Sequence, residues 1–229
     1  MSERNLLGVE SARESEAFAA VRGGRLAERY RALRAIVEAA GPTTPASADG
    51  SGSLIVLVVG VDHGVSDVGI RLAAAFADGG RSTFLIDADL RAESRHRLLR
   101  PGGHAPFGIA DWLTSEASEP ALPAYPSGLA NLTVLPAGTA GRWRDDPLAS
   151  ARLPKLIQAV RSARERAVVI APPLAEAADA LFLAPHADGT LLVVVPGKTG
   201  GPNALKARET LLATGARLYG VILGEAEPR

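Results

Sequence analysis

The chain has 229 residues, 47% of them apolar, and it carries 25 acidic and 25 basic side chains. This length is that of one large α/β domain with ample chain to bury a core. The neutral charge balance gives no support for binding to nucleic acid. The absence of cysteine excludes disulfide bonds and thiolate metal sites, and it fits a reducing cytoplasm.

Residues 1–18 carry charges throughout and lack the apolar stretch that a signal peptide needs. The longest apolar run, Leu54 to Val59, is far shorter than the ~20 residues that cross a bilayer. We therefore expect a cytoplasmic protein without direct membrane insertion, which reaches the inner face of the membrane only through a partner chain.

Residues 10–40 are rich in Ala, Leu, Glu and Arg and are predicted to be helical, with an apolar stripe that includes Leu26, Leu33 and Val37. Pro, Gly, Ser and Thr dominate residues 41–53, which is typical of a linker. The chain is thus predicted to consist of a helical segment 1–40, a linker 41–53 and an α/β domain 54–229.

From residue 54 onward, predicted strands and helices alternate. The strands are nearly all apolar, which is typical of parallel strands buried on both faces. We expect strands at 54–60, 82–89, 131–138, 167–173, 189–197 and 217–223, and helices at 66–80, 108–116, 148–165, 175–184 and 202–214. The pattern predicts a mostly parallel, doubly wound α/β sheet flanked by helices, with an N-terminal helical extension.

In such sheets ligands bind at the carboxyl ends of the strands, and the first strand-to-helix turn spans residues 59–69. A phosphate-binding P-loop requires the pattern G-x-x-x-x-G-K-[ST] at this turn. Gly64 and Ser66 match the pattern, whereas Val59 replaces the first glycine and Val65 replaces the lysine. We therefore expect a P-loop NTPase-like domain in which the phosphate loop, if present, is degenerate.

The loop also gains two carboxylates, Asp62 and Asp67, which would repel a phosphate group unless a cation compensated them. After Met1 the first lysine in the chain is Lys155, so no lysine near the loop replaces the missing one. We expect either an ordinary strand–turn–helix connection or a vestigial nucleotide loop. That loop consists of Gly60, Asp62, His63, Gly64, Ser66 and Asp67.

An ordered series of segments carries a resemblance to a known family: LIDADLR (85–91), LTVLPAGT (132–139), APP (171–173), DALFLAPHADGTLLVVVPGKT (179–199) and GARLYGVIL (215–223). Over residues 25–224 the chain resembles the kinase domain of bacterial tyrosine kinases (BY-kinases) of capsule and exopolysaccharide synthesis, within the Par/Min-type P-loop ATPases.

The resemblance implies that Asp87 and Asp89 act on the metal and the attacking group. It also implies a homo-oligomer whose interface includes Glu28, Arg31 and Arg34. The same three side chains would otherwise form a solvated helix face with weak ion pairs. The partner implied by the resemblance is a membrane polysaccharide co-polymerase or chain-length-determinant protein.

The departures from the family fall on the chemistry. Where the family has an aspartate before Thr-Pro-Pro, this chain has Ile170, and the tyrosine cluster that the family carries at its C-terminus is missing. We therefore expect a catalytically inactive, pseudokinase-like protein that regulates or scaffolds a membrane export complex, with no cofactor, no metal and no catalytic residue. The positions equivalent to the family's catalytic residues are Val65, Asp87, Asp89 and Ile170.

Two alternatives stay open. The first is a nucleotide-binding ATPase or tyrosine autokinase with an atypical P-loop, in which Ser66, Asp87 and Asp89 hold Mg²⁺ for ATP or ADP. Either Arg71 or Arg91 would then replace the lysine.

The second alternative is a module that binds another small ligand in a pocket lined by Asp62, His63 and Asp87. Lys198 follows a predicted strand, where it is either a plain surface lysine or a contact for an anion.

Overall fold

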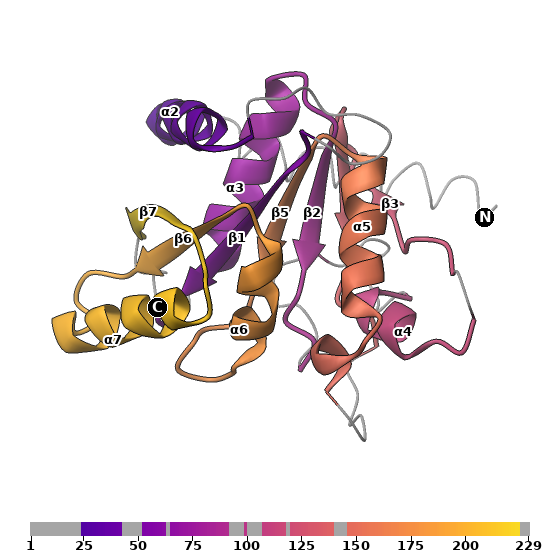
Figure 1. Cartoon of the computed structure of the whole chain (residues 1–229). Helices are drawn as coiled ribbons and strands as arrows, with labels where there is room; N and C mark the ends of the chain where they lie inside the picture. The colour runs from indigo at the N-terminus through magenta and orange to yellow at the C-terminus, as the bar shows by residue number, and fades with distance from the viewer. Residues whose placement is uncertain are drawn as a thin grey trace, which may run out of the picture.

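The computed structural model describes residues 24–42, 52–62, 65–91, 99, 107–117, 120–139 and 146–224. Within these residues, seven strands form one sheet in the order β3-β4-β2-β5-β1-β6-β7 (Figure 1). All neighbouring strands are parallel except β3 and β4. The strands are β1 (Leu54–Gly60), β2 (Thr83–Asp87), β3 (Tyr125–Pro126), β4 (Leu132–Leu135), β5 (Arg166–Ile170), β6 (Gly189–Val194) and β7 (Leu218–Leu223).

Helices cover both faces of the sheet, and two apolar clusters form the core, one on each face. One face carries α2 (Gly24–Ala40) and α3 (Val65–Asp78). The other face carries α4 (Ile109–Thr114), α5 (Leu153–Ala163), α6 (Asp179–Leu183), α7 (Gly201–Ala213) and the short 3₁₀ helices η3 (Pro147–Ala149) and η4 (Ala184–His186). The predicted fold class, a mostly parallel doubly wound sheet, is confirmed.

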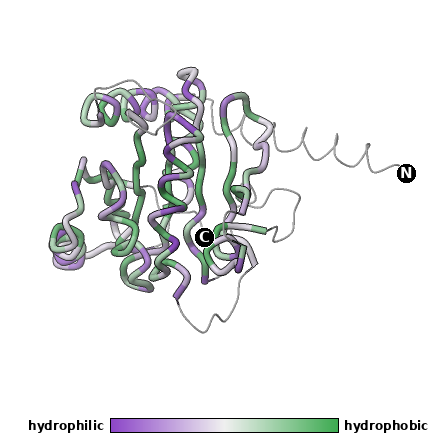
Figure 2. The backbone as a smooth tube through the Cα atoms, turned by 45° about the vertical axis from the view of Figure 1, so that its right-hand side comes forward, coloured by the Kyte–Doolittle hydropathy of each residue, from purple (hydrophilic) through white to green (hydrophobic). Residues whose placement is uncertain are grey.

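The burial pattern explains why the central strands could be recognised. Every residue of β1 and of β2 is buried, so an uninterrupted apolar run marks each strand. Figure 2 shows these apolar strands in the middle of the molecule, with hydrophilic residues on the outer helices. Helix α2 joins this core through Val37, which is 0% exposed. The predicted division of the chain into a helical segment 1–40, a linker 41–53 and an α/β domain 54–229 stays a prediction.

The structure differs from several predicted elements; for example, the predicted helix 175–184 begins only at Asp179, as α6, and ends in η4. The predicted helix 148–165 is divided into η3 and α5, because Pro147 and Pro154 each begin a new helical segment. Strand β3 is only two residues long, which is too short for a periodic pattern. Of the predicted helix 10–40, residues 10–23 lie outside the described residues.

Polar side chains tie the amino ends of the central strands together. Arg161 of α5 donates to both carboxylate oxygens of Asp188, at 2.8 and 3.1 Å. The same carboxylate accepts a hydrogen bond of 2.7 Å from the backbone N–H of Ile55 in β1. This network lies at the amino ends of the strands. It therefore stabilises the fold, and it is far from the carboxyl ends, where sheets of this kind bind ligands.

Glu165 belongs to the same edge and provides a pH-dependent contribution to stability. Its carboxylate accepts hydrogen bonds from the backbone N–H of Ser82 at 3.0 Å and from the guanidinium of Arg81 at 3.3 Å. The Ser82 bond above all lowers the pKa of Glu165 below its ordinary value. A carboxyl group with a lowered pKa stabilises the fold at neutral pH, and this contribution is lost as the pH falls through the folded-state pKa.

We expect Glu165→Gln to lower the free energy of unfolding by about 1 kcal/mol at neutral pH. The effect is no larger because the Glu165 side chain is 34% exposed, and solvent screens its charge. The difference from the wild type should shrink as the pH falls towards about pH 3, because protonation of Glu165 removes the contribution of its carboxylate. Urea unfolding at both pH values measures it. A difference of unchanged size at the lower pH would contradict this role for the carboxylate.

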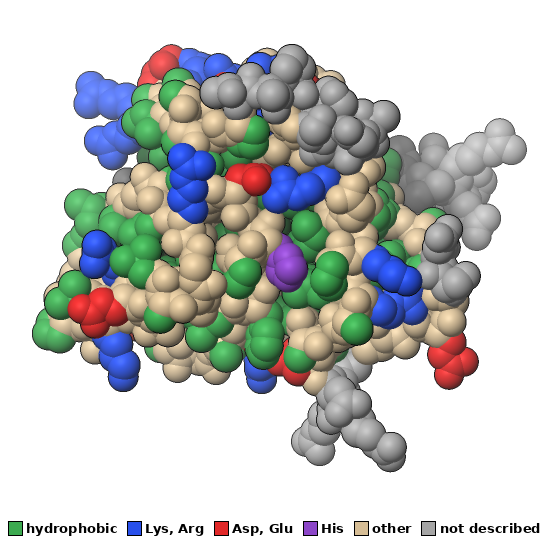
Figure 3. Space-filling view, viewed as in Figure 1, with side chains coloured by type: hydrophobic (Ala, Val, Ile, Leu, Met, Phe, Trp, Pro, Cys, Tyr) green, Lys and Arg blue, Asp and Glu red, His purple; other side chains and the backbone are tan. Residues whose placement is uncertain are grey.

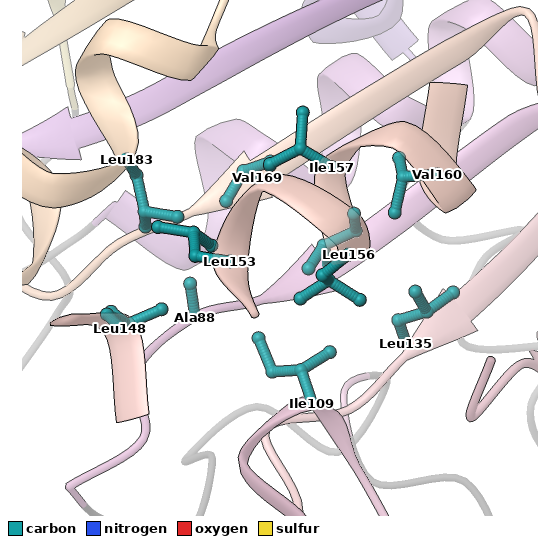
Figure 4. A pocket seen from close by; sticks show the side chains of 11 residues that line it. Ala88, Ile109, Leu135, Leu148, Leu153, Leu156, Ile157, Val160, Val169 and Leu183 are labelled. Carbon is teal, nitrogen blue, oxygen red and sulfur yellow. The ribbon is translucent and has the colours of Figure 1, made fainter. Parts of the chain in front are cut away.

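A small apolar cavity of about 20 Å³ lies between α5 and the sheet (Figure 4). Leu153 and Leu156 of α5 line one side of it, and Ile109 and Leu135 line the other. A dry cavity that accepts a molecule as small as benzene measures roughly 150 Å³. This space is therefore a packing gap, and it is not the pocket that the small-ligand alternative requires.

Candidate functional site

The carboxyl ends of the parallel strands meet at one edge of the sheet. Strand β1 lies between β5 and β6, and the chain runs from β1 towards β2 on one side and reaches β6 on the other. This is the topological switch point at which open α/β sheets bind ligands. The residues that follow β1, β2, β5 and β6 at this edge make up the candidate site.

The turn after β1 leads directly into α3, and the residue that the motif aligns with the P-loop lysine is a buried valine. Val65 is the first residue of α3 and is 4% exposed. Its side chain packs over Gly60, where an added methyl group would overlap both Val65 and the carbonyl oxygen of Asp62. Residue 65 thus serves as a core contact of the loop. His63 and Gly64 lie outside the described residues.

Ile170 occupies the end of β5, and it points into the core below α3. It is 3% exposed, and it pairs with Asp87 of β2 in the register of the two strands. A methyl group on Gly69 of α3 would overlap the side chain of Ile170. The isoleucine therefore fills the space between the sheet and α3. An apolar side chain at this point offers no ligand to a metal ion.

The remaining oxygen donors of the site are Asp87, Asp89 and Ser66. Asp87 is 2% exposed at the end of β2, and its Oδ1 accepts a hydrogen bond of 3.1 Å from the backbone N–H of Asp89. Asp89 is half-buried, as is Ser66 in the first turn of α3. Oxygen donors of this kind suit Mg²⁺.

Among the residues that the structure describes, no three carboxylate or histidine side chains gather into a metal site. A magnesium ion at this edge would therefore depend on phosphate oxygens and water as well as on Asp87, Asp89 and Ser66. The donor set fits a magnesium–nucleotide complex better than it fits a bare metal ion.

The two arginines considered as substitutes for the lysine are both held in ion pairs. Arg71 donates to Asp67 one turn earlier on α3, at 2.7 Å, and its side chain is only 18% exposed. This pair compensates the charge that Asp67 adds to the loop. Arg91 donates to Asp179 at the start of α6, at 2.7 Å, and lies 3.7 Å from Asp146.

The bond to Asp179 above all raises the pKa of Arg91 above its ordinary value. Asp179 is 2% exposed, so its charge is buried and needs this partner. The Arg91–Asp179 pair joins the turn after β2 to α6. Sequence reasoning missed Asp179, although it lies in the segment 179–199 that carries the family resemblance.

A second missed residue is Thr199, in the turn that follows β6. Its hydroxyl donates to the Oδ2 of Asp62 at 2.7 Å and accepts from the backbone N–H of Val195 at 3.1 Å. Asp62 therefore faces the neighbouring turn. Lys198 in this turn was a candidate from the sequence, but no pattern in the sequence linked the turn to the phosphate loop.

Helix α2 carries the predicted oligomer contacts. Arg31 forms an ion pair with Glu28, and the two side chains are 51% and 72% exposed. Arg34 instead donates to the carbonyl oxygen of Ala75 in α3, at 3.1 Å. Figure 3 shows acidic and basic side chains interspersed over the visible face, with basic ones projecting at the end occupied by α2. Glu28 and Arg31 are open to a partner, whereas Arg34 holds α2 on the domain.

A comparison with the profiles of known protein families gives no match. Among individual proteins, the chain is 30% identical over 197 residues to the tyrosine-protein kinase YwqD of Bacillus subtilis (strain 168), covering 86% of this chain and 79% of YwqD. It is 31% identical over 188 residues to the succinoglycan biosynthesis transport protein ExoP of Rhizobium meliloti (strain 1021), covering 78% of this chain. The matched region is only 23% of ExoP.

Solved structures share the fold. The chimerical protein CapA2B2 superposes with a TM-score of 0.76 at 20% identity, over 90% of this chain and 87% of CapA2B2. The septum site-determining protein MinD of Pyrococcus horikoshii OT3, complexed with Mg-ADP, superposes with a TM-score of 0.58 at 22% identity, over 75% of this chain and 69% of that chain.

These comparisons correct one expectation. The sequence analysis expected no cofactor, because the loop lacks its lysine and carries extra carboxylates. The relative YwqD is named a tyrosine-protein kinase, and MinD holds Mg-ADP, which points to nucleotide and magnesium binding. The expected repulsion between the loop carboxylates and a phosphate group was overestimated, because Arg71 pairs with Asp67 and compensates its charge. From the match to YwqD, together with the resemblance across the whole core, the chain belongs to the bacterial tyrosine kinases of exopolysaccharide and capsule synthesis.

Proposed function

We propose that this member of the bacterial tyrosine kinase family binds a magnesium–nucleotide complex without transferring its phosphoryl group, and that it oligomerises to regulate or scaffold a membrane complex of exopolysaccharide synthesis. The observation that carries the proposal is the side chain at the end of β5. Ile170 stands where the family has a metal-binding aspartate, is 3% exposed, and packs against Gly69.

Phosphoryl transfer depends almost wholly on positioning and electrostatic stabilisation, so the loss of charged groups removes its main source of rate. Val65 supplies no positive charge to a phosphate, and Ile170 supplies no oxygen to a metal ion. Arg71 and Arg91 are engaged with Asp67 and Asp179, respectively. These pairings argue against the alternative of an active autokinase with an arginine in place of the lysine.

The residues that remain are suited to holding a nucleotide. The N-terminus of α3 offers backbone N–H donors and the positive end of a helix dipole to phosphate groups. Asp87, Asp89 and Ser66 would hold the magnesium ion together with water. When bound, the metal supplies positive charge that offsets the carboxylates of this edge.

The experiment is to incubate the purified protein with Mg²⁺ and ATP labelled at the γ-phosphate, and in parallel to measure its melting temperature with and without Mg-ADP. We expect no labelled protein and a raised melting temperature, since saturation at 100 times Kd adds ~2.7 kcal/mol. Label on a tyrosine would overturn the proposal and favour the autokinase. An unchanged melting temperature would refute nucleotide binding.

The oligomer of this proposal is supported by the exposed Glu28–Arg31 pair on α2. The partner would be a membrane polysaccharide co-polymerase or chain-length-determinant protein, which would place this chain at the inner face of the membrane. No helix in the described part of the chain is long and apolar enough to cross a bilayer.

Arg31→Glu should lower the oligomer mass of the wild type, because it reverses the charge at the centre of the proposed interface. Arg29→Glu makes the same change at an exposed position on the opposite side of α2 and should leave the mass unchanged. Light scattering coupled to gel filtration measures both variants. A wild type that stays monomeric at about 50 μM, roughly the range of weak homo-oligomers, or equal masses for both variants, would contradict this interface.

A further inference from the structure

The turn after β6 is fastened to the turn after β1. The two strands are parallel neighbours, with Gly60 paired to Val193, so their carboxyl ends leave the sheet side by side. The Thr199 hydroxyl donates to Asp62 across the two turns, at 2.7 Å. The backbone N–H groups of Lys198 and Thr199 both donate to the carbonyl oxygen of Val195, at 3.1 and 2.9 Å. The position of residue 198 beside the phosphate loop is therefore defined by hydrogen bonds.

Lys198 differs from the other cations near this edge in having no bound partner. Arg71 and Arg91 each donate to a carboxylate at 2.7 Å. The Lys198 side chain is exposed, and it forms no ion pair or side-chain hydrogen bond with any residue that the structure describes. Its ammonium group on a flexible four-carbon stem remains available to an anion.

We propose that Lys198 contacts the phosphate groups of the bound nucleotide and supplies the positive charge that Val65 does not. The inference rests on the nucleotide binding proposed above. It identifies Lys198 as the main source of positive charge for the phosphate groups of that nucleotide. Thr199 and Asp62 are positioning residues, because their hydrogen bond holds the turn of Lys198 next to the phosphate loop. An ammonium group binds phosphate as a point charge, so this geometry does not require the lysine to come from the loop itself.

The test is titration calorimetry of the full chain with Mg-ADP and, separately, with adenosine, which has no phosphate. We expect Lys198→Ala to weaken Mg-ADP binding about tenfold, as the loss of one charge-assisted contact, and to leave adenosine binding unchanged. Lys198→Arg should retain most of the affinity because it keeps the charge. The matched control is Lys206→Ala, which removes an exposed lysine within α7. This variant should bind Mg-ADP like the wild type.

Thr199→Val tests the positioning step. The valine has nearly the shape of threonine but cannot donate to Asp62, so Mg-ADP binding should weaken by roughly the same factor as in Lys198→Ala. The effect of Lys198→Ala should also shrink as salt is added, since salt screens an exposed charge.

Equal Mg-ADP affinity in the wild type and Lys198→Ala would overturn the assignment of Lys198 while leaving nucleotide binding intact. A parallel loss of adenosine binding in Lys198→Ala would overturn the phosphate contact and indicate a contact with the nucleoside. A wild type that binds no Mg-ADP would overturn both this inference and the proposed nucleotide binding.

Discussion

Ile170→Asp is expected to lower the free energy of unfolding by about 4 kcal/mol when no divalent metal is present. The new carboxylate would lie at a position that is 3% exposed, and it would face Asp87 on the neighbouring strand, which is 2% exposed. Two buried like charges without a cation oppose folding. The loss of the contact between Ile170 and Gly69 adds a cavity to this cost.

Adding Mg²⁺ should restore roughly 2 to 3 kcal/mol of this loss at saturation, because an ion that binds only the folded state stabilises it by mass action. Guanidinium unfolding with and without Mg²⁺ measures the recovery. Ile170→Asn is the control: it has the same shape as the aspartate variant and no charge, so its stability should respond to Mg²⁺ no more than that of the wild type. An aspartate variant that Mg²⁺ does not stabilise would contradict the assignment of this position to the family's metal site.

Arg91→Met is expected to lower the free energy of unfolding by about 3 kcal/mol, because it leaves the carboxylate of Asp179 buried without its cation. Asp179 is 2% exposed and receives three hydrogen bonds of 2.7 to 3.2 Å from Arg91. This loss of about 3 kcal/mol is at the low end of the range for breaking a buried ion pair, since the side chain of Arg91 is itself 56% exposed. Urea unfolding measures the effect.

The matched control is the double variant Arg91→Met with Asp179→Asn, in which the buried charge is also removed. We expect it to be more stable than Arg91→Met alone by about 1 to 2 kcal/mol, because a neutral amide costs less to bury than an unpaired carboxylate. A double variant that is less stable than the single one would show that the carboxylate keeps other stabilising partners.

The central strands and the fold class could be predicted because burial on both faces leaves a direct mark in the sequence. Strand β1 has the predicted bounds 54–60. The helix boundaries leave a weaker mark in the sequence. Pro147 and Pro154 each lie in the first turn of a helical segment, where proline is tolerated, so the predicted helix 148–165 is two segments in the structure, and the first of them, η3, packs beside α4 and α6.

The candidate site was predictable where a single residue type decides the chemistry. Valine at position 65 and isoleucine at position 170 have no charge in any fold, so the motif alone is enough to predict an effect on phosphoryl transfer, and that effect stays a prediction. The pair of Asp67 with Arg71 has the spacing of helix neighbours and could also have been found.

The contacts between distant segments could not have been found from one sequence. Arg91 and Asp179 are 88 residues apart, and Asp62 and Thr199 are 137 residues apart. Each contact depends on which strands become neighbours in the sheet, and local patterns of residues contain no information about that order. The importance of Thr199, and through it of Lys198, therefore emerged only from the fold.

The most direct test of the account is a single-turnover measurement with the protein in excess over Mg-ATP. After several hours the nucleotide is released by denaturation and separated into ATP and ADP. The proposal places Val65 and Ile170 at the positions of two charged groups that phosphoryl transfer requires, and it predicts that the bound nucleotide is recovered as ATP, at the level of a protein-free sample. Conversion of the bound ATP to ADP, with the phosphoryl group on water or on a tyrosine, would contradict it.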